Sequence, residues 1–123
     1  MMRVLLADDQ TAVRAALRLL LEQEANIKVV GETADTVGLF LAITQKAPEL
    51  VLLDWELPGL PPVQLLRLLR YERPLLKVVA MSSRPEAQPE AIEAGVHAFV
   101  SKSEPPERVL AVIRGLFKQE RGV

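Results

Sequence analysis

Five short apolar runs recur along the chain, and a longer stretch with helical spacing follows each of them. Val and Leu fill these runs almost without polar alternation, which is typical of parallel strands that are covered on both faces. The third run lies in the segment ELVLLDWELPG, residues 49–59, where an unbroken apolar stretch ends in Asp54. We predict strands over residues 3–7, 27–31, 50–54, 76–81 and 98–101.

The intervening stretches carry apolar residues at the spacing of an amphipathic helix, as Val13, Leu17 and Leu21 do in the first of them. Parallel strands need crossover connections, and helices of this length supply them. A length of 123 residues suits a single domain. The alternation of strands and helices predicts an α/β fold: a doubly wound, five-stranded parallel sheet in a three-layer sandwich. Helices are predicted over residues 11–24, 35–46, 62–72, 87–94 and 104–119.

Charged or hydroxyl-bearing residues stand at the ends of four of the five predicted strands. Because doubly wound sheets bind ligands at the carboxyl ends of their strands, we expect these side chains to meet at one edge. The second strand leads only to Gly31 and Glu32, as expected of an outer strand. The polar residues at the other four ends are Asp8 and Asp9, Asp54, Ser82 and Ser83, and Lys102.

This set of side chains indicates phosphoryl chemistry. Three carboxylates that lie close together repel one another unless a cation compensates them. Oxygen ligands without His or Cys favour a hard ion such as Mg²⁺. A lysine and a hydroxyl beside that ion form a pocket for a tetrahedral anion, and an Asp side chain can itself accept a phosphoryl group.

The segments LLADDQ, LVLLDWELPG, VVAMSS and AFVSK lie in the order that CheY-like response-regulator receiver domains have, and they resemble the signature segments of that family. IKVVGETAD and ERVLAVIRGL are similar to receivers of the NarL/LuxR type. The resemblance covers essentially the whole chain. It implies a flavodoxin-like (βα)5 fold with strand order 2-1-3-4-5, a receiver domain over residues 1–120, and a tail or linker start over 121–123.

The resemblance also implies a role for each site residue. Asp54 matches the phosphoacceptor, and it shares a Mg²⁺ (or Mn²⁺) ion with Asp8, Asp9 and the backbone carbonyl of Glu56. Asp54 is also expected to act in catalysis together with Ser82 and Lys102.

Four positions match the residues that bind the phosphoryl group or respond to it. Ser82 matches the switch hydroxyl, and Ser83 fills the small-residue position beside it. Lys102 matches the lysine that pairs with the phosphoryl oxygen, and Phe99 matches the aromatic whose rotamer reports phosphorylation.

The implied partner is a sensor histidine kinase. Output is expected on the face of the fourth helix, fifth strand and fifth helix, which is also a candidate homodimer surface. Transcription control would then belong to a DNA-binding domain outside this sequence, because a net charge of −1 without a basic stripe argues against nucleic-acid contact here. With no cysteine, leader or long apolar run, we expect a cytoplasmic domain without membrane contact. The resemblance also implies that the domain is not an enzyme acting on other substrates.

Departures from the family pattern keep two alternatives open. Pro62 stands eight residues after the predicted acceptor, where receiver domains commonly have Gly. The segment between Ser82 and Lys102 is about two residues shorter than in a usual receiver domain. It contains Pro85 and Pro89, so the fourth helix is expected to begin late or be irregular. One alternative is a pseudo-receiver, an interaction module that phosphorylation does not control. The other is a small phosphohydrolase, although Glu56 stands where such enzymes have a second Asp.

Three further expectations concern residues near the site or on the surface. Trp55 is expected either over the rim of the site or in ordinary packing, and His97 at the surface. The apolar excess on the second and third helices, around residues 39–43 and 65–69, marks a candidate partner surface.

Overall fold

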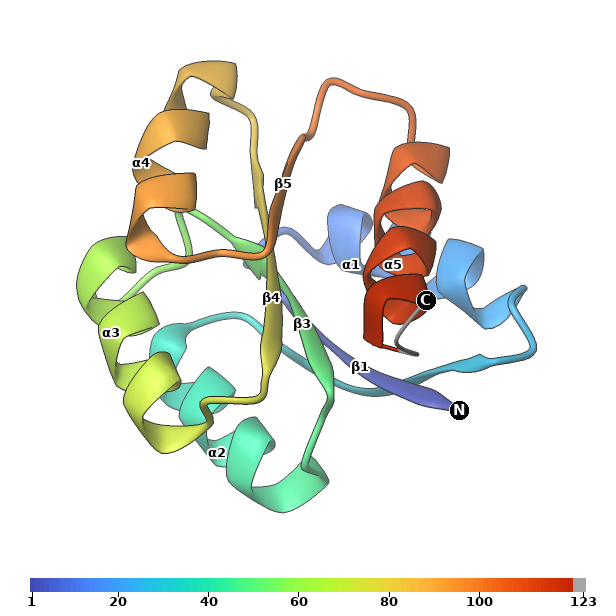
Figure 1. Ribbon diagram of the computed structural model, residues 1–123, viewed down its shortest axis with the longest axis horizontal. Coiled ribbons are helices and arrows are strands. Elements are labelled where there is room, and N and C mark those ends of the chain that lie inside the picture. Colours follow the sequence, from blue (N-terminus) through green and yellow to red (C-terminus); the bar gives the residue numbers. More distant parts are fainter. Residues whose placement is uncertain (121–123) are drawn as a thin grey trace.

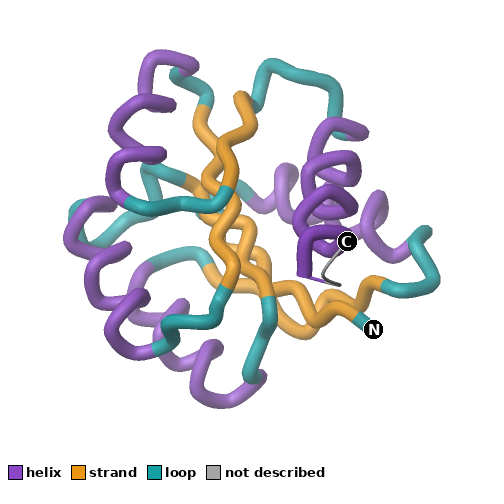
Figure 2. Tube along the Cα trace, in the orientation of Figure 1, coloured by secondary structure: helices purple, strands orange, loops and turns teal. Residues whose placement is uncertain are grey.

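The computed structural model describes residues 1–120, and the predicted tail, 121–123, lies outside the described residues. A five-stranded parallel sheet in the order β2-β1-β3-β4-β5 forms the central layer (Figures 1 and 2). This confirms the predicted α/β fold and strand order. The strands are β1 (Met2–Ala7), β2 (Ile27–Thr33), β3 (Leu50–Asp54), β4 (Lys77–Ser82) and β5 (Ala98–Ser101). The helices are α1 (Thr11–Glu22), α2 (Thr36–Lys46), α3 (Pro62–Glu72), the 3-10 turn η1 (Pro85–Ala87), α4 (Gln88–Ala94) and α5 (Glu107–Glu120).

Two apolar cores lie on the two faces of the sheet. Helices α2, α3 and α4 cover one face, and α1 and α5 cover the other (Figure 1). Successive side chains of β3 alternate between them: Val51 and Leu53 belong to the first core, Leu50 and Leu52 to the second. Burial on both faces explains why the β3 sequence is apolar without alternation.

The ends of the predicted elements shift by up to three residues, and proline causes the largest shift. Helix α5 begins at Glu107 rather than at 104, because Pro105 and Pro106 disfavour helical backbone before them and lack an N–H group. The expected irregularity of the fourth helix is confirmed, since a 3-10 turn precedes an α4 of seven residues. None of the helices described over residues 1–120 is long and apolar enough to span a bilayer.

Gly59 fixes the loop between β3 and α3, which lies just after the predicted acceptor. It has a φ of +125°, and a Cβ at this position would overlap the Thr36 side chain. Thr36 itself holds the loop, because its N–H donates to the Pro58 carbonyl at 3.0 Å and its Oγ1 accepts from the Leu60 N–H at 3.2 Å.

We therefore expect Gly59→Ala to lower the free energy of unfolding by about 2 kcal/mol in urea denaturation, through backbone strain and steric overlap. Gly115→Ala is the matched control, since Gly115 lies in helix α5 with no atom within 4 Å of an added Cβ. That control is expected to be neutral or slightly stabilising. Equal effects of the two substitutions would contradict this account of the loop.

Candidate functional site

The carboxyl ends of β1 and β3 bring the three predicted acidic residues together. Asp8, Asp9 and Asp54 each offer a carboxylate oxygen, and these oxygens all lie within 4.8 Å of one another. Asp8 and Asp54 are only 3% and 4% exposed, whereas Asp9 is exposed. Such a cluster of oxygen donors suits a hard divalent cation, with its open side facing solvent.

Lys102 follows β5 and supplies the positive charge of the site. The Lys102 N–H donates to the Ser82 carbonyl at 2.8 Å, which fixes the backbone of Lys102 beside the end of β4. Its Nζ lies 2.8 Å from Asp8 Oδ2 and 3.5 Å from Asp54 Oδ1. Burial opposes the charged form of this amine, but the hydrogen bond to Asp8 and the charge of Asp54 outweigh it and raise the pKa of Lys102. The ammonium is therefore retained across the physiological pH range.

Asp54 is a carboxyl with a strongly raised pKa. Burial raises its pKa from 3.8 to about 6, and the negative charge of Asp8 adds to this shift. The Glu56 N–H, which donates to Asp54 Oδ1 at 3.0 Å, and the charge of Lys102 act in the opposite direction. The ionised form of Asp54 is thus poorly stabilised by the protein alone, and an added cation would favour it.

Ser82 ends β4 with a fully buried side chain that contacts Glu56 rather than Asp54 in the described structure. Its Oγ donates to the Glu56 carboxylate, with both oxygens 2.9 Å away, and accepts from the Arg84 N–H at 3.0 Å. The Arg84 guanidinium forms an ion pair with Glu56, with a nitrogen 3.1 Å from Glu56 Oε2. No sequence pattern indicates this role for the Glu56 side chain, since the resemblance implies a role only for the backbone carbonyl of Glu56.

The remaining predicted site residues flank this centre. Ser83 is exposed next to Ser82, as a small residue beside an open pocket would be. Phe99 is half-buried and packs against the core under α2, α3 and α4. Ser83 directly follows the last residue of β4, whereas Phe99 is the second residue of β5 and pairs with Ala80. Their roles in binding or switching stay predictions.

The structure decides between the two alternatives for Trp55 and corrects the expectation for His97. Trp55 is 1% exposed, so it packs in the core rather than over the rim, and its Nε1–H donates to Glu90 Oε1 of α4 at 2.8 Å. His97 is half-buried rather than a plain surface residue, because its Nδ1 accepts from the Val78 N–H at 3.1 Å. Both contacts join residues far apart in the sequence, so no local pattern could have indicated them.

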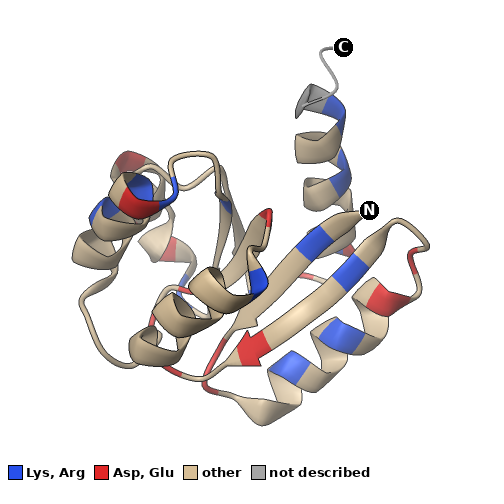
Figure 3. Ribbon diagram, turned by 90° about the horizontal axis from the view of Figure 1, so that it is seen from below, with Lys and Arg blue, Asp and Glu red and all other residues tan. Residues whose placement is uncertain are grey.

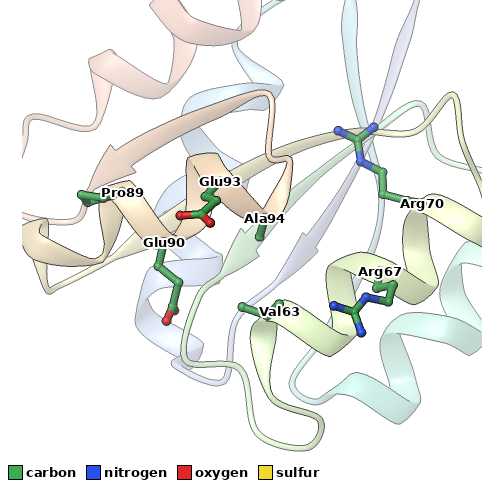
Figure 4. A pocket seen from close by; sticks show the side chains of 7 residues that line it. All are labelled: Val63, Arg67, Arg70, Pro89, Glu90, Glu93 and Ala94. Atoms are coloured by element: carbon green, nitrogen blue, oxygen red, sulfur yellow. The ribbon is translucent and has the colours of Figure 1, made fainter.

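A separate cleft of about 730 Å³ lies between α3 and α4 (Figure 4). Arg67 and Arg70 line it from α3, and Glu90 and Glu93 from α4. None of the three clustered aspartates lines this cleft, so it is distinct from the candidate site. In Figure 3, positions of Lys and Arg and positions of Asp and Glu are both spread over several helices and strands.

Comparisons with known proteins agree with this geometry. The family model described as "Response regulator receiver domain" matches residues 4–114. The chain is 29% identical over 123 residues to the response regulator UvrY of Escherichia coli K12, covering 98% of this chain and 56% of UvrY. It is 34% identical over 103 residues to protein-glutamate methylesterase/protein-glutamine glutaminase 2 of Hahella chejuensis, covering 81% of this chain and 28% of that protein.

Among solved structures, RcsB of Salmonella enterica serovar Typhimurium, bound to promoter rprA in the presence of phosphomimetic BeF3⁻, superposes with a TM-score of 0.89. It is 23% identical, and the match covers 97% of this chain and 63% of that one. The chain thus spans about half the length of UvrY and less than a third of the methylesterase. The match over residues 4–114 confirms the predicted resemblance, and the chain belongs to the response regulator receiver domain family.

Proposed function

We propose that this domain receives a phosphoryl group on Asp54 from a sensor histidine kinase, in a reaction that depends on Mg²⁺ or Mn²⁺. The observation that carries the proposal is the position of the buried Asp54 carboxylate, with Asp8 and Asp9 on one side and the Lys102 ammonium 3.5 Å away. An Asp54 oxygen forms the bond to phosphorus. The bond between phosphorus and the kinase imidazole breaks, and its electron pair stays on that nitrogen.

The donor set suits the proposed ion. Asp8, Asp9, Asp54 and the backbone carbonyl of Glu56 would hold it, and all of them are oxygen ligands. The bound ion supplies charge neutralisation for the phosphoryl oxygens, which is the main requirement of phosphoryl transfer. It would also offset the burial and the repulsion from Asp8, which together raise the pKa of Asp54.

Residues at the ends of β4 and β5 hold the product in this proposal. Lys102 pairs with one phosphoryl oxygen, and Ser82 donates its hydroxyl proton to another. Ser83 leaves room for the group, and Phe99 turns inward when Ser82 moves. The phosphorylated state then shifts the conformational population toward the one that partners bind.

We infer that output passes to transcription through a DNA-binding domain outside residues 1–123. The promoter complex of RcsB supports this inference, as does the fraction of UvrY that the chain spans. In this proposal the domain is cytoplasmic, is not an enzyme acting on other substrates and makes no nucleic-acid or membrane contact itself. Its signalling and dimer surface is the face formed by α4, β5 and α5.

Incubation with acetyl phosphate and Mg²⁺, followed by intact mass spectrometry, tests the proposal. We expect the wild-type chain to gain the mass of one phosphoryl group and to lose it over time, and EDTA to prevent the gain. The pseudo-receiver alternative predicts no gain in Mg²⁺. Steady turnover of a phosphate ester, abolished in Asp54→Asn, would instead favour the phosphohydrolase.

A further inference from the structure

We propose that the Glu56 side chain is a positioning residue that holds the Ser82 hydroxyl away from Asp54 and so opposes switching. This proposal rests on the proposed function, because it concerns access of Ser82 to a phosphoryl group on Asp54. We call the Glu56, Ser82 and Arg84 side chains, with their mutual contacts, the serine clamp.

The clamp follows from the hydrogen-bonding capacity of a hydroxyl. A serine has one proton to donate, and Ser82 gives it to the Glu56 carboxylate, whose two oxygens both lie 2.9 Å from Oγ. The oxygens of a phosphoryl group at neutral pH are acceptors and need the same proton. Glu56 and a phosphoryl group on Asp54 therefore compete for the Ser82 hydroxyl, and only one of them can have it.

Burial of Ser82 strengthens the hold of Glu56 on its hydroxyl. The Ser82 side chain is fully buried, so bulk water cannot hydrogen-bond to its hydroxyl. A buried hydroxyl without a hydrogen-bond partner lowers the stability of the fold. The acceptor is charged, which strengthens the hydrogen bond relative to one with a neutral partner. In the unphosphorylated domain the hydroxyl is therefore held by Glu56.

Arg84 gives the clamp a way to open. Its guanidinium lies 3.1 Å from Glu56 Oε2, and the Glu56 and Arg84 side chains are 38% and 53% exposed. When Ser82 turns to the phosphoryl group, the Glu56 carboxylate keeps this ion pair and its contact with water. The negative charge of the phosphoryl group also repels Glu56, so phosphorylation itself favours opening.

The first test measures the clamp without any phosphoryl mimic. In urea denaturation, Glu56→Ala, Ser82→Ala and the double variant form a double-mutant cycle. We expect the two changes to be non-additive by about tenfold in the unfolding equilibrium constant, as for a hydrogen bond to a charged group. Additive effects would show that Glu56 does not hold Ser82, and would overturn the proposal.

The second test measures the consequence of the clamp, as the affinity for beryllofluoride in Mg²⁺ followed by ¹⁹F NMR. Releasing Ser82 in Glu56→Ala is expected to tighten binding about tenfold, and the gain should vanish when Ser82→Ala is also present. A merely structural role predicts a loss of affinity. Glu86→Ala is the matched control, because it removes an exposed carboxylate from the 3-10 turn after β4 without touching the clamp.

The outcomes separate this proposal from the proposed function. If wild type binds beryllofluoride and Glu56→Ala binds no tighter than Glu86→Ala, the effect is general charge and the clamp is wrong. A gain that survives Ser82→Ala also contradicts it. If wild type does not bind the mimic at all, the proposed function fails, while the stability cycle still decides whether Glu56 holds Ser82.

Discussion

Replacing Asp54 by Asn is expected to abolish phosphoryl labelling and, at the same time, to stabilise the metal-free domain. Labelling is lost because an amide oxygen does not form the acyl phosphate. The chain should still fold, since the Asn side-chain oxygen can accept the Glu56 N–H as Asp54 Oδ1 does at 3.0 Å. Persistent labelling of the variant would mean that another residue is the acceptor.

The gain in stability follows from the pKa of Asp54. In the folded chain this pKa is raised to about 6, mainly by burial, whereas its ordinary value is 3.8. Between these values the folded state binds more protons than the unfolded state, so the stability contributed by this group is lost as pH rises from about 4 to about 6. Above pH 6 the ionised carboxylate costs wild type about 3 kcal/mol that Asn does not incur.

Urea denaturation in EDTA at pH 4 and pH 8 measures this difference. The free energies of unfolding of wild type and Asp54→Asn should be similar at pH 4. At pH 8 the variant should be the more stable one, and Mg²⁺ should reduce the gap by stabilising wild type. An equal difference at both pH values would contradict the assigned titration of Asp54.

The second large effect is expected for Lys102→Met. Lys102 is the cation that faces both buried carboxylates, and without it Asp8 and Asp54 are left uncompensated. Removing one partner of a buried ion pair typically costs 3–5 kcal/mol, so we expect a loss of about 3 kcal/mol in EDTA at pH 8. At pH 5 the loss should be smaller, because Asp54 is then mostly protonated.

Two further variants separate the charge of Lys102 from other effects. Lys28→Met is the control for the chemical change, since Lys28 is exposed on β2, and we expect less than about 0.5 kcal/mol for it. Asp54→Asn combined with Lys102→Met should recover much of the lost stability. If the double variant is as unstable as Lys102→Met, the lysine acts through packing and not through charge.

Lys102→Met is also expected to bind Mg²⁺ but to signal poorly.

The sheet and the acidic cluster were predictable from sequence because both follow from local pattern. The apolar run of β3 indicates burial on both faces, and the parallel topology then places Asp54 beside Asp8 and Asp9. The position of Lys102 follows from the same rule. Each of these residues stands directly at a strand end, where chain order alone fixes the neighbourhood.

The side-chain partners near α4 were not predictable in the same way. Trp55 reaches Glu90 across 35 positions of sequence, and Glu56 reaches Ser82 across 26. The first contact depends on how α4 packs against the sheet, and the second on how the loop after β3 lies against the end of β4. The prolines before α4 indicated an irregular backbone in that segment. No sequence pattern indicated that Glu90 would accept from Trp55 and Glu56 from Ser82.

The most direct measurement of the central claim is the position of the phosphoryl group on the chain. After incubation with acetyl phosphate and Mg²⁺, borohydride reduces an aspartyl phosphate to homoserine, and tandem mass spectrometry locates that residue. We expect homoserine at position 54 alone, and none when EDTA is present. Homoserine at Asp8 or Asp9, or a labelled chain with Asp54 unmodified, would contradict it.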